Sequence, residues 1–178
     1  MRKPITILSI FAVAIFAVYR YAKSKGISLG KLPSKPPKIR LVYSRNIPEK
    51  ERVKITQSKD VVDLFRKIWS SQMEIREEFY VLLLDRANKV IGYHVLSQGG
   101  TAGTVVDTKI LFALALESLA NSIIIAHNHP SGSLKPSQQD INLTRKVKES
   151  GQTMDIQVLD HIIITKESHF SFADEGLL

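Results

Sequence analysis

The sequence predicts an α/β domain, a layered mixed β-sheet flanked by helices, with a single apolar segment in front of it. Apolar β-branched runs alternate with stretches of helical periodicity beyond about residue 56. A length of 178 residues is enough for one domain with a substantial core plus appendages. Charge divides the chain, because residues 1–59 hold fourteen Lys/Arg and two Asp/Glu, whereas residues 60–178 hold eleven and fifteen.

The first expected element is an apolar stretch at the N-terminus. Residues 4–19 carry no charge, and sixteen helical residues reach about 24 Å, against roughly 30 Å of hydrocarbon. The aromatic and basic residues around Arg20 suit the membrane interface and can extend a short span. We therefore expect a single transmembrane anchor in residues 1–25. A cleaved signal peptide, or a helix of another kind, is the alternative.

The residues that follow the stretch predict its orientation. Two basic residues precede it, and seven follow it up to Arg40. This bias predicts a single-pass membrane protein whose C-terminal domain is cytoplasmic, with a basic flank that could contact anionic lipid headgroups. Residues 26–52, rich in Pro and Lys, are expected to form a tether. The folded domain is then residues 53–178.

The first half of the folded part predicts a strand, a helix and a hairpin. Residues 39–43 alternate like a short edge strand, and Ser58 is a candidate N-cap for a helix that continues to about Ser70. The apolar run 79–84 predicts a buried strand, joined through a turn at Asn88-Lys89 to a second strand at 90–96.

The second half predicts two helices and further strands. Asp107 is a candidate cap for a helix over 108–120, with Leu119 among its inward residues, and Ser137 for a helix that ends near Ser150, with Gly151 after it. The predicted strands are 122–126, one or two within 156–165, and a short one within 168–178.

Two histidines at the end of the strand 122–126 are the strongest chemical signal. His127 and His129 are one residue apart, so an extended backbone directs both imidazoles to the same side. Asp140 can return to them if residues 131–136 form a loop and a helix then begins. Two imidazoles and a carboxylate leave one position of a tetrahedral Zn²⁺ for water, as in catalytic zinc sites. With no Cys in the chain, zinc would need His and carboxylate ligands.

Each of these residues also has a structural interpretation. His127 and His129 could be ordinary loop histidines, and Asp140 could simply complete a capping box with Ser137. A hydrolase also needs a general base. Glu77 and Glu78 precede the buried strand, and alternation allows only one of them to face a metal. Both could instead be solvated charges.

Three segments resemble the JAMM (MPN-type) zinc site of the RadC family: 126–132 with Pro136-Ser137-x-x-Asp140, 77–85, and 158–164. The similarity runs from about Thr56 to Leu178. It implies His127, His129 and Asp140 as zinc ligands with water as the fourth. It also implies Glu77 as general base, with Glu78 as the alternative, and Ser137 as an oxyanion donor or N-cap. Asp160 and His161 match a further motif, and we expect His161 to be structural.

The function that these features predict is a membrane-anchored, zinc-dependent hydrolase of peptide or isopeptide bonds. One alternative is a DNA-repair or DNA-processing factor of the RadC type. The acidic balance of the folded part argues against nucleic-acid binding by that domain. The N-terminal helix-hairpin-helix region common in that family is also replaced here by the apolar stretch and tether. A second alternative is a non-catalytic MPN interaction module, which usually lacks the metal ligands.

Overall fold

The computed structural model describes residues 17–18, 20–26, 47–99 and 106–178. The expected strand at 39–43 and most of the expected membrane stretch lie outside the described residues. Among the helices that the structure does describe, none is both long and apolar enough to cross a bilayer. By its contacts the chain divides into two units, Met1–Arg40 and Leu41–Leu178. The second unit contains the sheet and is described below.

The second unit is built on one mixed sheet of five strands in the order β2-β1-β3-β4-β5. Strands β3 and β4 are parallel, and the other neighbouring pairs are antiparallel. The prediction of a mixed sheet flanked by helices is confirmed. The strands are β1 (Glu78–Leu84), β2 (Val90–Gln98), β3 (Ser122–Asn128), β4 (Gln157–Ile164) and β5 (His169–Ser171).

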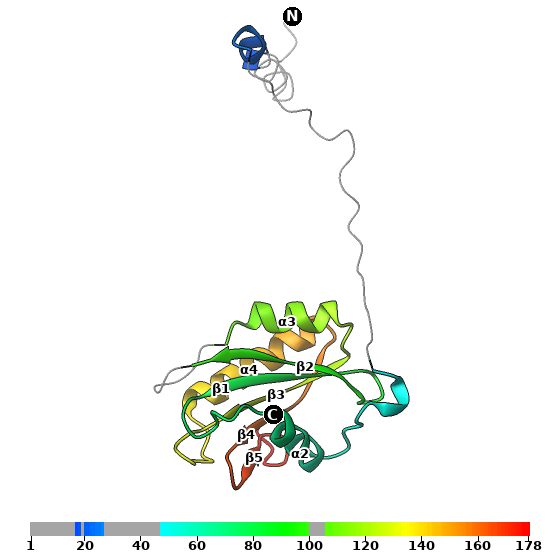
Figure 1. The fold of residues 1–178 in the computed structure, drawn as a ribbon, viewed down its shortest axis with the longest axis vertical. Coiled ribbons are helices and arrows are strands. Elements are labelled where there is room, and N and C mark those ends of the chain that lie inside the picture. The colour runs from blue at the N-terminus through cyan, green and yellow to red at the C-terminus, as the bar shows by residue number, and fades with distance from the viewer. Residues whose placement is uncertain (1–16, 19, 27–46, 100–105) are drawn as a thin grey trace, which may run out of the picture. The chain divides into compact units, whose positions relative to one another are not determined.

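Helices cover both faces of this sheet (Figure 1). Helix α2 (Ser58–Ile68) packs its residue Phe65 on the face that carries Tyr80 and Leu82 of β1. Helices α3 (Thr108–Glu117) and α4 (Gln138–Thr153) cover the opposite face, where Phe79 and Val81 lie. A short 3₁₀ turn, η1 (Glu49–Glu51), precedes α2 in this unit. The core is therefore two apolar layers, one on each side of the sheet.

Strand register determines which residues share a face. Phe79 pairs with His127 across the antiparallel β1–β3 ladder. Because side chains alternate along a strand, the odd-numbered residues of β1 and β3 point together toward α3 and α4. The even-numbered residues point toward α2. This alternation decides which of the predicted site residues can meet.

The start of α2 differs from the prediction. Its N-cap is Gln57 rather than Ser58. The carboxylate of Asp60 accepts hydrogen bonds from the backbone N–H groups of Thr56 and Gln57, at 2.8 and 3.2 Å, which places the helix start one residue earlier. The hydroxyl of Ser58 instead donates to Asp174 at 2.6 Å. Ser58, the predicted N-cap, therefore makes a tertiary contact instead of capping α2.

The ends of α3 and α4 also differ from the prediction. Helix α3 stops at Glu117, so Leu119 lies beyond it with φ +54° and is exposed, not inward. Helix α4 continues to Thr153, and Gly151 lies within it instead of ending it. The predicted turn at Asn88 and the N-cap at Ser137 are confirmed.

Candidate metal centre

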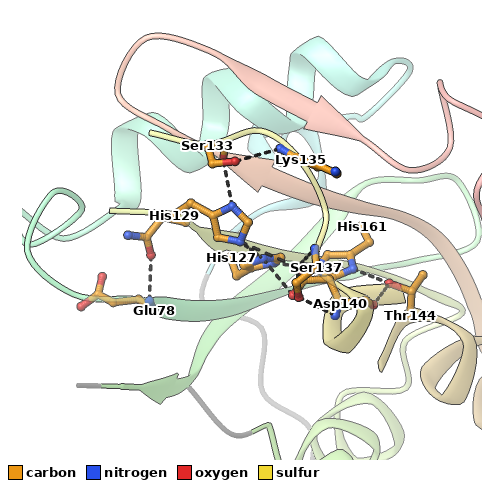
Figure 2. Close-up of polar contacts among 10 residues, drawn as sticks. Glu78, His127, His129, Ser133, Lys135, Ser137, Asp140, Thr144 and His161 are labelled. Carbon is orange, nitrogen blue, oxygen red and sulfur yellow. Dashed lines mark hydrogen bonds and ion pairs between the residues drawn. The ribbon is translucent and has the colours of Figure 1, made fainter. Parts of the chain in front are cut away.

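The end of β3 brings the two histidines of the motif together. His127 is the penultimate residue of β3 and is completely buried, and His129 follows the strand with 16% of its side chain exposed. Their Nε2 atoms lie 3.0 Å apart. Figure 2 shows both rings directed toward Asp140. The one-residue spacing thus places both imidazoles on the same side of the chain, as predicted from alternation.

Asp140 reaches the imidazoles from the first turn of α4. Its Oδ1 lies 3.2 Å from Nε2 of His127, and its Oδ2 lies 3.8 Å from Nε2 of His129. Oδ2 also accepts hydrogen bonds from the backbone N–H and the hydroxyl of Ser137, at 2.7 and 2.6 Å. Asp140 therefore completes the capping box and faces the histidines at the same time. The hydroxyl proton of Ser137 is used in this cap.

The three side chains form an arrangement that suits a divalent cation. One donor atom from each of His127, His129 and Asp140 lies within 4.8 Å of the others. Ligands about 2.0–2.1 Å from a tetrahedral ion are separated by about 3.3 Å. The two Nε2 atoms, 3.0 Å apart, and the pair of His127 Nε2 and Asp140 Oδ1, 3.2 Å apart, are close to that value. Burial raises the pKa of Asp140, but hydrogen bonds from His127 and Ser137 outweigh it and hold this pKa well below its usual range. The carboxylate is thus an anionic ligand at neutral pH.

Glu77 lies on the same side of the sheet as this cluster. Since Phe79 pairs with His127, the register places Glu77 across from His129, although Glu77 itself precedes β1. It is half-buried. Burial raises the pKa of Glu77, and the charges of His127 and His129 partly offset this effect. Glu77 is thus near enough to the cluster for their charges to act on it.

Glu78 faces the other way, toward α2, and is completely buried. Figure 2 shows its side chain directed away from the imidazoles. Its carboxylate accepts hydrogen bonds from Ser70 at 2.6 Å, from Gln98 at 3.2 Å and from Arg76 at 3.3 Å. These partners hold the Glu78 carboxylate on the face of the sheet opposite the candidate metal ligands.

Asn128 has a structural role that the sequence analysis did not predict. Its Oδ1 accepts a hydrogen bond from the backbone N–H of Glu78 at 2.7 Å. Its Nδ2 donates to the carbonyl oxygens of Met73 and Arg76, at 2.6 and 2.9 Å. The residue between the two histidines thus holds the segment that carries Glu77. The only sequence signal was its position in the His-Asn-His motif.

The second nitrogen of each imidazole also has a partner. Nδ1 of His129 lies 2.7 Å from the carbonyl oxygen of Ser133, and Nδ1 of His127 lies 2.8 Å from Nε2 of His161. Nδ1 of His161 lies 2.6 Å from the hydroxyl oxygen of Thr144. Burial lowers the pKa of His161 well below its ordinary value. His161 lies behind His127 and is not one of the three clustered ligands, and Thr144 was not predicted at all.

A hollow of about 300 Å³ adjoins the site on the side of His129. Its lining includes Met73, Pro130, Leu134 and Lys166. A larger hollow of about 580 Å³ lies where α4 meets β4, and none of the candidate site residues lines it. The hollow of about 300 Å³ is thus lined by one of the candidate ligands, His129.

Comparison with known proteins identifies a family for most of this unit. Residues 55–177 match the family model described as a RadC-like JAB domain. A UPF0758 protein of Flavobacterium johnsoniae is 48% identical over 124 residues, which cover 70% of this chain and 53% of that protein. A UPF0758 protein of Porphyromonas gingivalis is 40% identical over 137 residues, covering 76% and 60%. The UPF0758 protein SH1266 of Staphylococcus haemolyticus is 39% identical over 137 residues, covering 76% and 58%.

The matched segment spans little more than half the length of these curated relatives. It contains all the candidate metal ligands and Glu77.

Proposed function

The chain belongs to the RadC-like JAB domain family, and from this premise we propose that it is a zinc-dependent hydrolase of peptide or isopeptide bonds. The observation that carries the proposal is the convergence of His127, His129 and Asp140 from two separate elements. The interpretation of His127 and His129 as ordinary loop histidines does not explain why a carboxylate from the start of another helix lies beside them. The interpretation of Asp140 as a capping residue alone does not explain why it faces two imidazoles.

The donor set supports zinc as the cation. Two imidazole nitrogens and one carboxylate oxygen are the ligand types of catalytic zinc sites, which keep a fourth position open. The site has no thiolate, which softer metal ions prefer. When bound here, zinc would supply a Lewis acid and make water nucleophilic near neutral pH.

Glu77 supplies the general base in this proposal. It lies on the face of the cluster, and its raised pKa brings it closer to the range in which a carboxylate exchanges protons efficiently. Glu77 accepts a proton from the attacking water and delivers it to the leaving nitrogen. The geometry favours Glu77 over Glu78, because the Glu78 carboxylate accepts hydrogen bonds from four side chains on the opposite face, Ser70, Arg76, Tyr80 and Gln98.

The remaining residues position these groups and the substrate. Ser137 holds the Asp140 carboxylate through two hydrogen bonds, which supports its interpretation as an N-cap. An oxyanion role for Ser137 requires its hydroxyl to turn away from Asp140. The hollow beside His129 provides room for part of a peptide chain next to the ligands.

The experiment combines metal analysis with a substrate screen, using the full chain in detergent. Purified without chelator, it is expected to hold about one zinc per chain. His129→Ala should lose the zinc. Glu77→Gln should keep the zinc but lose activity on a panel of peptide and isopeptide substrates by about 10²–10⁴-fold. The activity that depends on Glu77 should decline as pH falls through a pKa above the ordinary 4.5, since the base must be ionised.

Glu78→Gln is the matched control, because it makes the same change at the neighbouring residue on the other face. It should keep both zinc and activity while lowering the stability of the fold. A wild-type chain that takes up no zinc would contradict the proposal. Equal activity of the Glu77→Gln variant and the wild type would contradict the assignment of the base.

A further inference from the structure

We infer that His161 and Thr144 act as positioning residues that hold His127 in one tautomer, with its Nε2 lone pair directed at the candidate cation site. The inference rests on the proposed metal role of His127 and adds two residues to it. It is carried by a chain of short contacts from β3 through β4 to α4. Figure 2 shows this chain from His127 through His161 to Thr144.

The direction of the chain follows from Thr144. Its hydroxyl donates its single proton to the backbone carbonyl of Asp140 at 2.6 Å. The same oxygen lies 2.6 Å from Nδ1 of His161. Because the hydroxyl proton is already used, the oxygen can only accept here. Nδ1 of His161 therefore carries a proton.

The next link sets the proton on His127. Nε2 of His161 faces Nδ1 of His127 at 2.8 Å, and two N–H groups cannot point at each other over that distance. His161 is completely buried and stacked on Phe172, with ring centroids 4.7 Å apart, so a charged ring there is costly. A neutral His161 with its proton on Nδ1 presents a lone pair at Nε2. Nδ1 of His127 must then donate, so the neutral form of His127 has its lone pair at Nε2.

His129 reaches the same form by an independent route. Its Nδ1 lies 2.7 Å from the carbonyl oxygen of Ser133, which can only accept. In their neutral forms both imidazoles therefore carry the proton on Nδ1 and leave Nε2 to bind a cation beside Asp140. The group that accepts the Nδ1 proton of a metal-binding imidazole is usually a carboxylate, a carbonyl or water. At His127 the partner is a neutral imidazole, which needs Thr144 to define its own tautomer.

Helix α4 links this arrangement to the third ligand. Asp140 and Thr144 are four residues apart and thus lie on one face of the helix. The turn that delivers the carboxylate also delivers the hydroxyl that orients His161. A single helix therefore sets both the anionic ligand and the tautomer of the neighbouring imidazole.

A nitrogen-specific measurement tests the inference on the full chain in detergent. The chain has five histidines, so ¹⁵N-histidine labelling with long-range ¹H–¹⁵N correlation can resolve each ring. In metal-free protein, His127 is expected in the form protonated at Nδ1. This readout needs neither zinc nor activity. A His127 whose Nδ1 carries no proton would overturn the inference.

Zinc affinity, measured by chelator competition, tests the two residues by substitution. His161→Leu removes the acceptor and should weaken zinc binding about 10–100-fold. His161→Gln offers an oxygen near the position of Nε2 and should stay within threefold of the wild type. Thr144→Val should also weaken zinc binding. Thr144→Ser, which keeps the hydroxyl, should bind zinc about as tightly as the wild type.

Phe172→Leu is the matched control, because it loosens packing on the same ring without removing a hydrogen bond. It should change zinc affinity less than threefold. Equal losses for His161→Leu and His161→Gln, with both folded, would overturn the inference. If His161→Leu does not fold, the Thr144→Val and Thr144→Ser pair decides. A wild-type chain that shows the expected tautomer but binds no zinc refutes the proposed function and leaves the tautomer assignment standing.

Discussion

At the scale of single residues, side chains at the end of β3 lie on both faces of the sheet. His127 and His129 point toward α4, and Asn128 between them points toward the segment before β1. Asn128 uses one acceptor and both donors of its amide there. Three consecutive side chains thus connect the candidate ligands to the segment that carries Glu77.

Asn128→Asp is the substitution that tests this connection. A carboxylate can still accept from Glu78 but cannot donate to the carbonyls of Met73 and Arg76, so two partly buried acceptors lose their donor. We expect the free energy of unfolding, measured with urea, to fall by about 2–4 kcal/mol. Catalysis by Glu77 should fall further than zinc binding. Asn142→Asp makes the same chemical change at an exposed position of α4 and should stay within about 0.5 kcal/mol of the wild type.

Sequence reasoning could predict the candidate ligands but not the residues behind them. The spacing of His127 and His129 fixes a shared direction, and the helix start at Ser137 limits where Asp140 can lie. Alternation separates Glu77 from Glu78 but cannot say which of the two faces the histidines. That choice depends on the pairing of Phe79 with His127, which is a tertiary fact. Thr144 is part of the site only because α4 packs on β4, and no local pattern indicates it.

At the scale of elements, the strands were predicted more closely than the helix ends. The apolar runs that form β1 and β3 are buried on both faces, which their composition indicates directly. Helices α3 and α4 are instead followed by Leu119 and Asp155, both with positive φ. Glycine is the usual residue for that conformation, so neither end carried its expected signal. Gly151 is the glycine that predicted a helix end, but it lies within α4.

Gly151 is required by close packing inside α4. A Cβ at this position would lie 2.4 Å from the backbone oxygen of Ile156. Gly151→Ala should therefore lower the free energy of unfolding by about 1–3 kcal/mol, although alanine is the better helix former. Urea denaturation measures the effect. Asp155→Gly, at the true left-handed position, is the contrast and should stay within about 1 kcal/mol of the wild type. A Gly151→Ala variant as stable as the wild type would show that the helix can shift away from β4.

At the scale of the whole molecule, the chain combines two parts with different chemistry. The family match begins at residue 55, and the segment before it carries most of the positive charge. The domain beyond has more acidic than basic residues, so its surface charge does not favour nucleic acid. The relatives are matched over little more than half their length. Whatever the N-terminal segment of this chain does is therefore a property to be tested on this chain itself.

The apolar stretch at residues 4–19 makes a prediction about location. We expect the full chain to remain with membranes in both 1 M salt and carbonate, because a transmembrane anchor does not depend on charge. Attraction of the basic flank to lipid headgroups alone would be screened by that salt. Replacing Ile10 and Val13 together by Lys places two charges in the stretch, at about 2.5–3.5 kcal/mol each, and should release the chain. The Ile10→Leu, Val13→Leu pair should not.

Reporter fusions and mass spectrometry distinguish the anchor from its alternatives. A fluorescent protein fused after Leu178 should fluoresce, and alkaline phosphatase at that position should be inactive, because the basic residues after the stretch favour a cytoplasmic C-terminal domain. Mass spectrometry of the purified chain should find the N-terminal stretch intact. A chain shortened near Ala22, or an active phosphatase, would indicate a cleaved signal peptide and an exported domain. Either result would place the candidate metal centre on the other side of the membrane and change which proteins could reach it as substrates.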